Sequence, residues 1–481
     1  MAGRARNAGT GKAPRTALKA RLQAGLTARQ AGDAPAAERI FRDILRDHPG
    51  QPDALNLLGV LLAESGRAEE AVAPLRKAAA ARPNSASIPL NLAQTLLAAN
   101  RPGEAVNILS RLTDSGADAA AQLLLVRALL ADRRPDEAAA QARRALALTP
   151  QDPALLTALG DALVQSERAA EALARYEAAI AAAPGHVPAY NNLGTALEKL
   201  GRLDQAAEAF RRALERMPDH SGARINLGTV LLRMGDAKGA EREFEAVLER
   251  EPFNRRAIAY LAIARQESGA LSPAAARAAL EPLIHEEYPG CPEAFPTLKE
   301  FHARLAEELY GHPARRRDVS GTATTGGYDA LRLFDHDAPA LKAFEGLLRA
   351  AIDRHITRLP REAGHPFPGR RPDRYALDIW ATFLESGGYQ FPHLHPSGWI
   401  SGVYYVQVPS SVSGGSGGHE GWIEFNRPDE SFGYTFRPET ILKRPQPGLL
   451  LLFPSYAYHR TLPFESDTDR ISIAFDVKPA G

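Results

Sequence analysis

Small and large apolar residues recur along the first 285 residues with a period close to 34. Seven alanines mark this period, at spacings of 34, 34, 33, 34, 34 and 34 residues: Ala37, Ala71, Ala105, Ala138, Ala172, Ala206 and Ala240. In several units a glycine lies twelve residues before the alanine, and a large apolar residue lies four after it. Prolines such as Pro184 and Pro218 close most units. The period predicts one helical pair per unit, with small residues where the two helices touch.

This pattern resembles the tetratricopeptide repeat. The resemblance implies an all-α solenoid over residues 17–285, with about seven repeats and a capping helical pair. Such solenoids commonly hold a peptide or protein partner in a concave groove, which Asn191, Asn192 and Asn226 could line. The alternative is that the array only supports self-assembly and that these asparagines are ordinary exposed helix residues.

The period changes in the second half of the chain. Residues 286–320 are rich in proline, glycine and polar residues and predict a linker with a helix, while apolar spacing predicts helices over 296–310 and 338–358. Strand patterns then follow over 375–384, 399–408, 421–426, 449–453 and 470–477, with a Gly/Ser hairpin loop at 413–418. We therefore expect a double-stranded β-helix (jelly-roll) domain with flanking helices over residues 321–481.

Composition narrows the classes of partner. The net charge is +1 and gives no argument for nucleic acid, and no apolar run approaches the ~20 residues that span a membrane. A single cysteine, Cys291, excludes a disulfide framework, so we expect a cytoplasmic protein. Residues 1–16 are basic and predict a disordered tail, since no apolar segment follows as a secretory signal requires.

The candidate chemistry lies in the strand region. His393 and His395 are two positions apart, so their rings would leave the same face of a strand. His459 and Arg470 come from later strands, and Ser472 follows Arg470 on the same face. Three imidazoles suit iron and other first-row metals, and an arginine suits a carboxylate because its two N–H groups bind it in parallel.

These segments resemble the 2-oxoglutarate- and Fe(II)-dependent oxygenases, in the prolyl-hydroxylase-like branch found with tetratricopeptide repeats. The motifs that carry the resemblance lie within 392–396, 401–406, 443–455 and 459–475. It implies that His393 and His459 hold iron, and that Arg470, Ser472 and Tyr405 hold the distal carboxylate of 2-oxoglutarate. It also implies a peptide or protein substrate, with ascorbate as a candidate reductant.

The third metal ligand departs from the family pattern. The usual set is His-x-Asp/Glu with a later histidine, but His395 stands in the place of the carboxylate. We expect His395 to be the ligand. The alternatives are a water ligand with His395 behind it, or a carboxylate reached through space from Asp378, Glu420 or Glu424.

Other functions compete with a protein hydroxylase. The domain could be an inactive barrel on an interaction scaffold, although an inactive barrel would not need Arg470 and Ser472. It could oxidise a small molecule, with the repeats used only for assembly. It could also be a cupin-type metalloenzyme, but cupins place a glutamate four or five residues after the second histidine, where Trp399 and Ile400 stand. The remaining histidines, including His302 and His355, are expected at the surface or at caps.

Overall fold

The computed structural model describes residues 12–114, 119–317, 322–336, 338–360, 367, 369, 371–372, 374–414 and 418–479. The chain divides into two compact units, Met1–Pro218 and Asp219–Gly481. The second unit contains the last repeats as well as the whole strand region. The expected boundary at residue 285 therefore does not coincide with this division.

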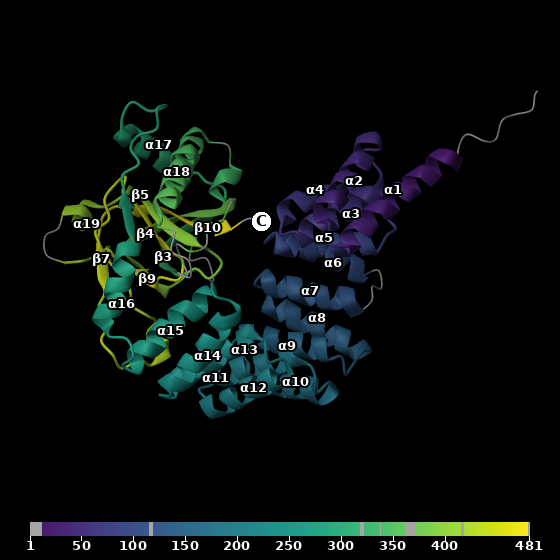
Figure 1. The fold of residues 1–481 in the computed structure, drawn as a ribbon, viewed down its shortest axis with the longest axis horizontal. Helices are drawn as coiled ribbons and strands as arrows, with labels where there is room; N and C mark the ends of the chain where they lie inside the picture. The colour runs from purple at the N-terminus through teal and green to yellow at the C-terminus, as the bar shows by residue number, and fades with distance from the viewer. Residues whose placement is uncertain are drawn as a thin grey trace, which may run out of the picture. The chain divides into compact units, whose positions relative to one another are not determined.

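Helical pairs form the repeats, as the 34-residue period predicts (Figure 1). The described residues of the first unit form twelve helices: α1 (Lys12–Gln30), α2 (Ala34–Asp47), α3 (Pro52–Glu64), α4 (Ala68–Ala81), α5 (Ser87–Ala98), α6 (Pro102–Asp114), α7 (Ala119–Ala131), α8 (Pro135–Leu148), α9 (Pro153–Gln165), α10 (Ala169–Ala182), α11 (Val187–Lys199) and α12 (Leu203–Arg216). The second unit begins with α13 (Ser221–Arg233), α14 (Ala237–Arg250) and a capping pair, α15 (Arg255–Glu267) and α16 (Pro273–Leu280). The first helix begins at Lys12, five residues before the expected boundary, and the tail before it lies outside the described residues.

Close contacts between the paired helices explain the glycine and aromatic positions. A Cβ atom at Gly194 would lie 2.6 Å from the ring of Phe210, and one at Gly160 would lie 2.5 Å from Tyr176. Both aromatic side chains are fully buried. Only glycine allows this approach, so the sequence spacing of sixteen residues between the two positions encodes the packing of each helical pair.

The strand region forms a ten-stranded antiparallel sheet, curled as in a jelly roll. Its strands are β1 (His285–Glu287), β2 (Arg315–Arg317), β3 (Thr324–Leu331), β4 (Tyr375–His393), β5 (Ile400–Gln407), β6 (Ile423–Phe425), β7 (Ile441–Lys443), β8 (Leu450–Pro454), β9 (His459–Thr461) and β10 (Arg470–Pro479). The main path runs β1-β8-β5-β10-β4-β9-β6-β7, and β3 pairs with both β2 and β4.

The long strand β4 belongs to both halves of the curled sheet. Its residues 375–384 pair with β10, while Gln390 and His393 pair with β9 after a register shift. Gly387, with a φ of 77°, lies between the two pairings, where a left-handed backbone favours glycine. Side chains from β5 and β8 meet those from β6 and β7 in one apolar core, which shows that the two halves face each other.

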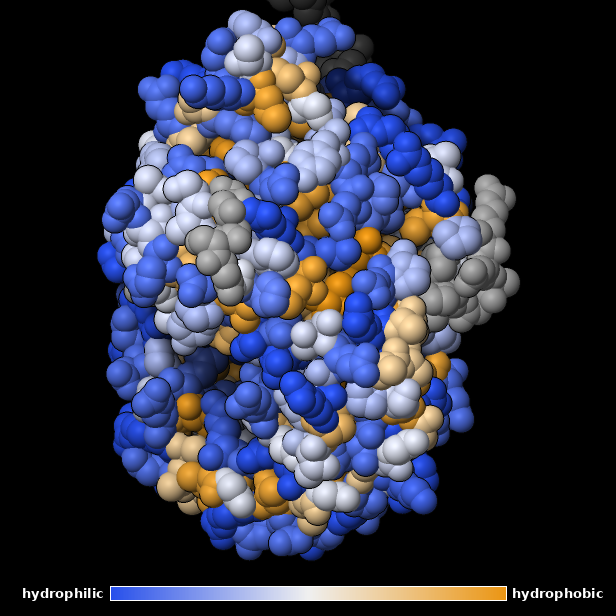
Figure 2. Space-filling view, turned by 90° about the vertical axis from the view of Figure 1, so that its left-hand side faces the viewer, coloured by the Kyte–Doolittle hydropathy of each residue, from blue (hydrophilic) through white to orange (hydrophobic). Residues whose placement is uncertain are grey.

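Two helices pack against one face of the sheet, over strands β4, β5, β8 and β10: α17 (Leu298–Tyr310) and α18 (Pro339–Arg358) (Figure 1). Both lie within a few residues of the expected helices. Short helical turns complete the fold: η1 (Glu281–Leu283), η2 (Leu333–Asp335), η3 (Glu430–Phe432) and α19 (Ser410–Gly414). The view in Figure 2 shows a mainly hydrophilic surface on which hydrophobic side chains gather only in small patches. Among the described residues, no helix has both the length and the apolar character needed to cross a membrane.

Two expectations about this region need correction. The segment 286–320, expected to be a linker with a helix, also contributes β1 and β2 to the sheet. The sequence does not predict these strands because they are short and charged and carry no apolar alternation. The Gly/Ser stretch begins within the short helix α19, and residues 415–417 lie outside the described residues.

Candidate active site

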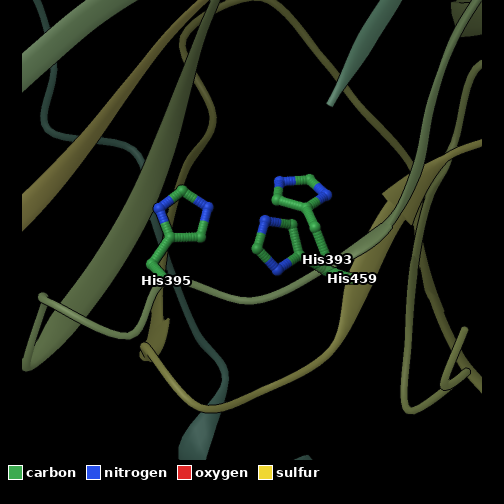
Figure 3. Close-up of side chains that lie close together, drawn as sticks. All are labelled: His393, His395 and His459. Atoms are coloured by element: carbon green, nitrogen blue, oxygen red, sulfur yellow. The ribbon is translucent and has the colours of Figure 1, made fainter. Parts of the chain in front are cut away.

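Three histidines from two strand ends lie together between the halves of the sheet (Figure 3). His393 ends β4, His459 begins β9, and the two are direct partners across the strand pair. His395 follows in the turn after β4, not in the strand, where its N–H donates to Ser455 O at 2.9 Å. One ligand nitrogen from each ring lies within 4.8 Å of the others, so all three imidazoles can reach one metal ion.

Each ring is oriented by a hydrogen bond to its Nδ1. His393 Nδ1 lies 2.8 Å from Phe391 O, and His459 Nδ1 lies 3.0 Å from Ala457 O. His395 Nδ1 lies 3.0 Å from the carboxylate of Asp476. These oxygens accept a hydrogen bond from Nδ1–H, which leaves the lone pair of each Nε2 free for a metal. The buried Nε2 of His395 has no hydrogen-bond partner among the described residues.

Burial keeps two of the imidazoles neutral. Burial and the neighbouring His395 lower the pKa of His393 to about 3. Burial, followed by the fields of His393 and His395, also lowers the pKa of His459 well below its ordinary value. Neutral imidazole is the form that binds a metal, so neither ring has to lose a proton at neutral pH.

A cation without a counterion lies on the wall of the same cavity. Arg470, at the start of β10, is 2% exposed, and among the described residues no carboxylate forms an ion pair with it. Within the part of the chain that the structure describes, its Nε and the hydroxyl of Tyr405 are both buried without a hydrogen-bond partner. The guanidinium carbon lies 4.9 Å from the centre of the Tyr405 ring.

Ser472 completes this group. It lies directly opposite Tyr405 in the pairing of β10 with β5, and both side chains line the cavity. An unpaired buried guanidinium is costly, and an anionic ligand would remove that cost. Arg470, Ser472 and Tyr405 together therefore fit a carboxylate, and the histidines fit a metal at the other side of the cavity.

Comparison with known families addresses both halves of the chain. Residues 378–476 match the family described as "Putative 2OG-Fe(II) oxygenase". Models of the tetratricopeptide repeat match residues 22–86 and 157–221, 62–129 and 197–262, and 119–162. The chain is a tetratricopeptide-repeat protein whose strand-rich domain is similar to the 2OG-Fe(II) oxygenases.

Two of the similar solved structures, TTC0263 and a Parabacteroides merdae protein, are tetratricopeptide-repeat proteins. TTC0263 from Thermus thermophilus is 23% identical with a TM-score of 0.35, and the match covers 37% of this chain and 98% of that one. MamA from Desulfovibrio magneticus RS-1 is 26% identical with a TM-score of 0.31, covering 35% and 96%. A protein from Parabacteroides merdae is 13% identical with a TM-score of 0.46, covering 51% and 98%. No curated protein matches this chain.

The contacts within the oxygenase domain exclude the carboxylates considered as replacements for His395. Glu424 is buried, but its carboxylate pairs with Arg427 and Arg460. Burial raises the pKa of Glu424, yet the hydrogen bonds from the two arginines outweigh it and the net pKa lies below its ordinary value. Asp378 pairs with Lys478 on the exposed side, and Glu420 is exposed. None of these residues lines the histidine cavity.

Several residues beyond the predicted site line the cavity or support its histidines, and of these Gln390, Thr461 and Asp476 were not predicted. The ring of Trp380 stacks on His395 with centroids 5.5 Å apart and an interplanar angle of 15°. Thr461 Oγ1 donates to Gln390 Oε1 at 3.0 Å. Asp476 could have been found, because it continues the alternation of Arg470 and Ser472 along one strand face in an otherwise apolar segment.

Three histidines outside the site, His302, His312 and His355, are buried and not exposed as expected. His302 and His355 each contact a residue of the sheet. His302 on α17 lies 2.8 Å from the hydroxyl of Tyr404, which points away from the cavity as its neighbour Tyr405 points into it. His355 on α18 is buried and stacks on His285 at 5.0 Å. Both join the helical layer to the sheet, a role that the sequence pattern does not reveal.

Proposed function

We propose that the protein is an Fe(II)- and 2-oxoglutarate-dependent dioxygenase that hydroxylates a peptide or protein substrate recruited by the repeats. In this proposal His393, His395 and His459 hold the iron. Arg470, Ser472 and Tyr405 hold the distal carboxylate of 2-oxoglutarate. A cytoplasmic location is part of the proposal, and ascorbate as a reductant remains a prediction that no contact in the structure addresses.

The observation that carries the proposal is Arg470, a buried guanidinium without an acidic partner in the described residues, beside three converging imidazoles. A metal site alone would fit many functions, and so would a buried arginine alone. Together in one cavity they fit a ligand that binds the metal at one end and presents a carboxylate at the other. 2-Oxoglutarate has this form.

The protein's own residues would do three things in the reaction. The Nδ1 hydrogen bonds fix the orientation of the imidazoles, so the metal ligands need little rearrangement. Arg470 orients the cosubstrate, and the apolar walls from Ile423 and Phe453 keep bulk water away from the reacting centre. Iron held here would supply the redox chemistry by which O₂ converts 2-oxoglutarate to succinate and CO₂ while a C–H bond becomes C–OH.

The substrate class rests on the repeats. Tetratricopeptide arrays generally bind peptides or proteins in a groove, and an enzyme that carries such an array gains a way to select its substrate. Asn192, expected in the groove, donates its Nδ2 hydrogen to Asp161 at 2.7 Å, and Tyr176 donates to the same carboxylate at 2.8 Å. The Oδ1 of Asn192 in turn accepts a hydrogen bond from Asn191 Nδ2 at 3.0 Å, so both asparagines belong to one polar network with Asp161.

The test is turnover with a cell extract as the source of substrate. Native protein with Fe(II), 2-oxoglutarate and ¹⁸O₂ should release succinate and place one ¹⁸O atom in a protein of the extract. His459→Ala and Arg470→Ala variants should do neither. Succinate without labelled protein would indicate a small-molecule substrate. No succinate from the native protein under any condition would favour an inactive scaffold.

A further inference from the structure

A buried carboxylate lies behind the unusual third histidine. Asp476 on β10 is 5% exposed, and its carboxylate lies 3.0 Å from His395 Nδ1. The hydroxyl of Ser401 donates to Asp476 Oδ1 at 2.6 Å and lies 2.9 Å from the hydroxyl of Ser455. Ser401 faces Asp476 across the β5–β10 pair. Hydrogen bonds therefore link Ser401 to Asp476 and Asp476 to His395.

No basic side chain accounts for the burial of this carboxylate. Among the described residues, no lysine or arginine forms an ion pair with Asp476. The nearby Lys478 pairs instead with Asp378, which is exposed. A buried carboxylate without a basic partner is costly unless other donors satisfy it, and here the donors are one hydroxyl and one imidazole.

Asp476 supplies the negative charge that a site of three neutral histidines lacks. A metal site with two histidines and one carboxylate carries one negative charge among its ligands, whereas three neutral imidazoles carry none. A carboxylate that accepts the Nδ1 proton of a ligand histidine makes the imidazole more basic and fixes its tautomer. It also places a negative charge beside the metal ligand, although the carboxylate does not bind the metal itself.

We propose that Asp476 is a positioning residue that acts through His395, so that the pair replaces the carboxylate ligand of related oxygenases. This inference rests on the proposed function, because it takes the three histidines to be metal ligands. Asp476 holds the Nδ1–H tautomer and directs Nε2 to the metal. Ser401 holds the carboxylate, and Trp380 stacked on the ring restrains its plane.

The experiment measures metal affinity without 2-oxoglutarate or turnover. Co(II) is titrated into the full-length protein in competition with a chromophoric chelator. Asp476→Asn should weaken binding by about 10–100-fold, because the amide satisfies Nδ1 less well and can force the wrong tautomer. The matched control is Asp378→Asn, which changes the strand partner of Asp476 on the exposed side and should stay within about twofold of native. An Asp476→Asn affinity within twofold of native would overturn the inference.

A double variant separates action through His395 from general distortion. In a His395→Ala background, Asp476→Asn should weaken Co(II) binding by less than about twofold further, because the residue through which it acts is gone. The same large loss in both backgrounds would also overturn the inference.

A second measurement decides the matter if Asp476→Asn does not fold. Long-range ¹H–¹⁵N spectra of histidine-labelled, metal-free native protein report the tautomer of His395, with His395→Gln to assign its signals. The Nδ1–H form is expected, and the Nε2–H form would overturn the inference. These readouts involve no turnover, so a protein that binds Co(II) as expected but forms no succinate would refute the proposed function alone.

Discussion

Arg470 and Asp476 lie six residues apart on the same face of β10, and both are almost fully buried. Arg470 lines the cavity itself, whereas Asp476 lies behind His395 and contacts its Nδ1. One strand thus carries a cation suited to a carboxylate at its start and an anion bonded to His395 near its end. The regular pairing of β10 with β4 keeps this alternation intact over its whole length. The register of this one strand therefore positions both the arginine proposed to bind 2-oxoglutarate and the aspartate bonded to His395.

Replacement of Arg470 should remove cosubstrate binding while leaving the metal site in place. Truncating a buried charge that pairs with a ligand typically costs several kcal/mol, so Arg470→Ala should weaken 2-oxoglutarate binding by about 100-fold or more. The affinity of Arg470→Lys for 2-oxoglutarate should lie between those of the native protein and Arg470→Ala, because a lysine keeps the charge but loses the paired N–H geometry. Calorimetric titration measures both affinities. Arg316→Ala, at an exposed arginine of the same domain, is the control, and an equal loss there would refute the assignment.

Glu424 should have no part in metal binding. Its carboxylate pairs with Arg427 and Arg460, so Glu424→Gln should leave Co(II) affinity within about twofold of native. The same change should lower the stability of the oxygenase domain, because two partly buried arginines lose their partner. Chelator competition and urea denaturation measure the two quantities. A large loss of affinity with unchanged stability would mean that Glu424, and not His395, completes the site.

The stability of the oxygenase domain should fall in acid because of His302. Burial lowers the pKa of His302 to about 4, below the value of about 6.5 in an unfolded chain. Between these values the unfolded state binds a proton that the folded state does not. The contribution to stability is therefore complete above about pH 6.5 and is lost as the pH falls to about 4, by roughly 3 kcal/mol in total.

A His302→Gln variant keeps a hydrogen-bonding group near Tyr404 but does not titrate, so its stability should vary less with pH. Tryptophan fluorescence during urea denaturation reports this domain alone, because Trp380, Trp399 and Trp422 all lie in it. The exposed His336→Gln serves as the control. Identical pH profiles for the native protein and His302→Gln would contradict the account.

The sequence predicts the parts of this protein that have a period. The 34-residue repeat reveals the helical pairs, and alternation reveals the long strands. It does not reveal β1, β2 or β7, which are three residues long and too short to alternate. The histidines and Arg470 are predictable because their residue types imply chemistry. Asp476 continues the polar alternation of Arg470 and Ser472, but its contact with His395 is not predictable, since it depends on the turn that brings His395 to Ser455 and the end of β10.

The repeats should tolerate alanine at one glycine and not at another. A Cβ at Gly194 would clash with the ring of Phe210, whereas one at Gly185 would meet nothing within 4 Å. Gly194→Ala should lower the free energy of unfolding by about 1–3 kcal/mol, since the packed ring cannot move freely. Gly185→Ala should change it by no more than about 0.5 kcal/mol. Thermal denaturation followed by far-UV circular dichroism compares them, and equal effects would refute the packing argument.

The most direct measurement is an anaerobic titration of 2-oxoglutarate into the metal-loaded and the metal-free protein. If the three histidines and Arg470 serve one ligand, native protein should bind 2-oxoglutarate tightly only with Fe(II). His459→Ala should then lose binding through the metal, and Arg470→Ala should lose it with Fe(II) still bound. Binding of equal affinity without metal, or in both variants, would contradict the central claim that one cavity holds iron and 2-oxoglutarate together.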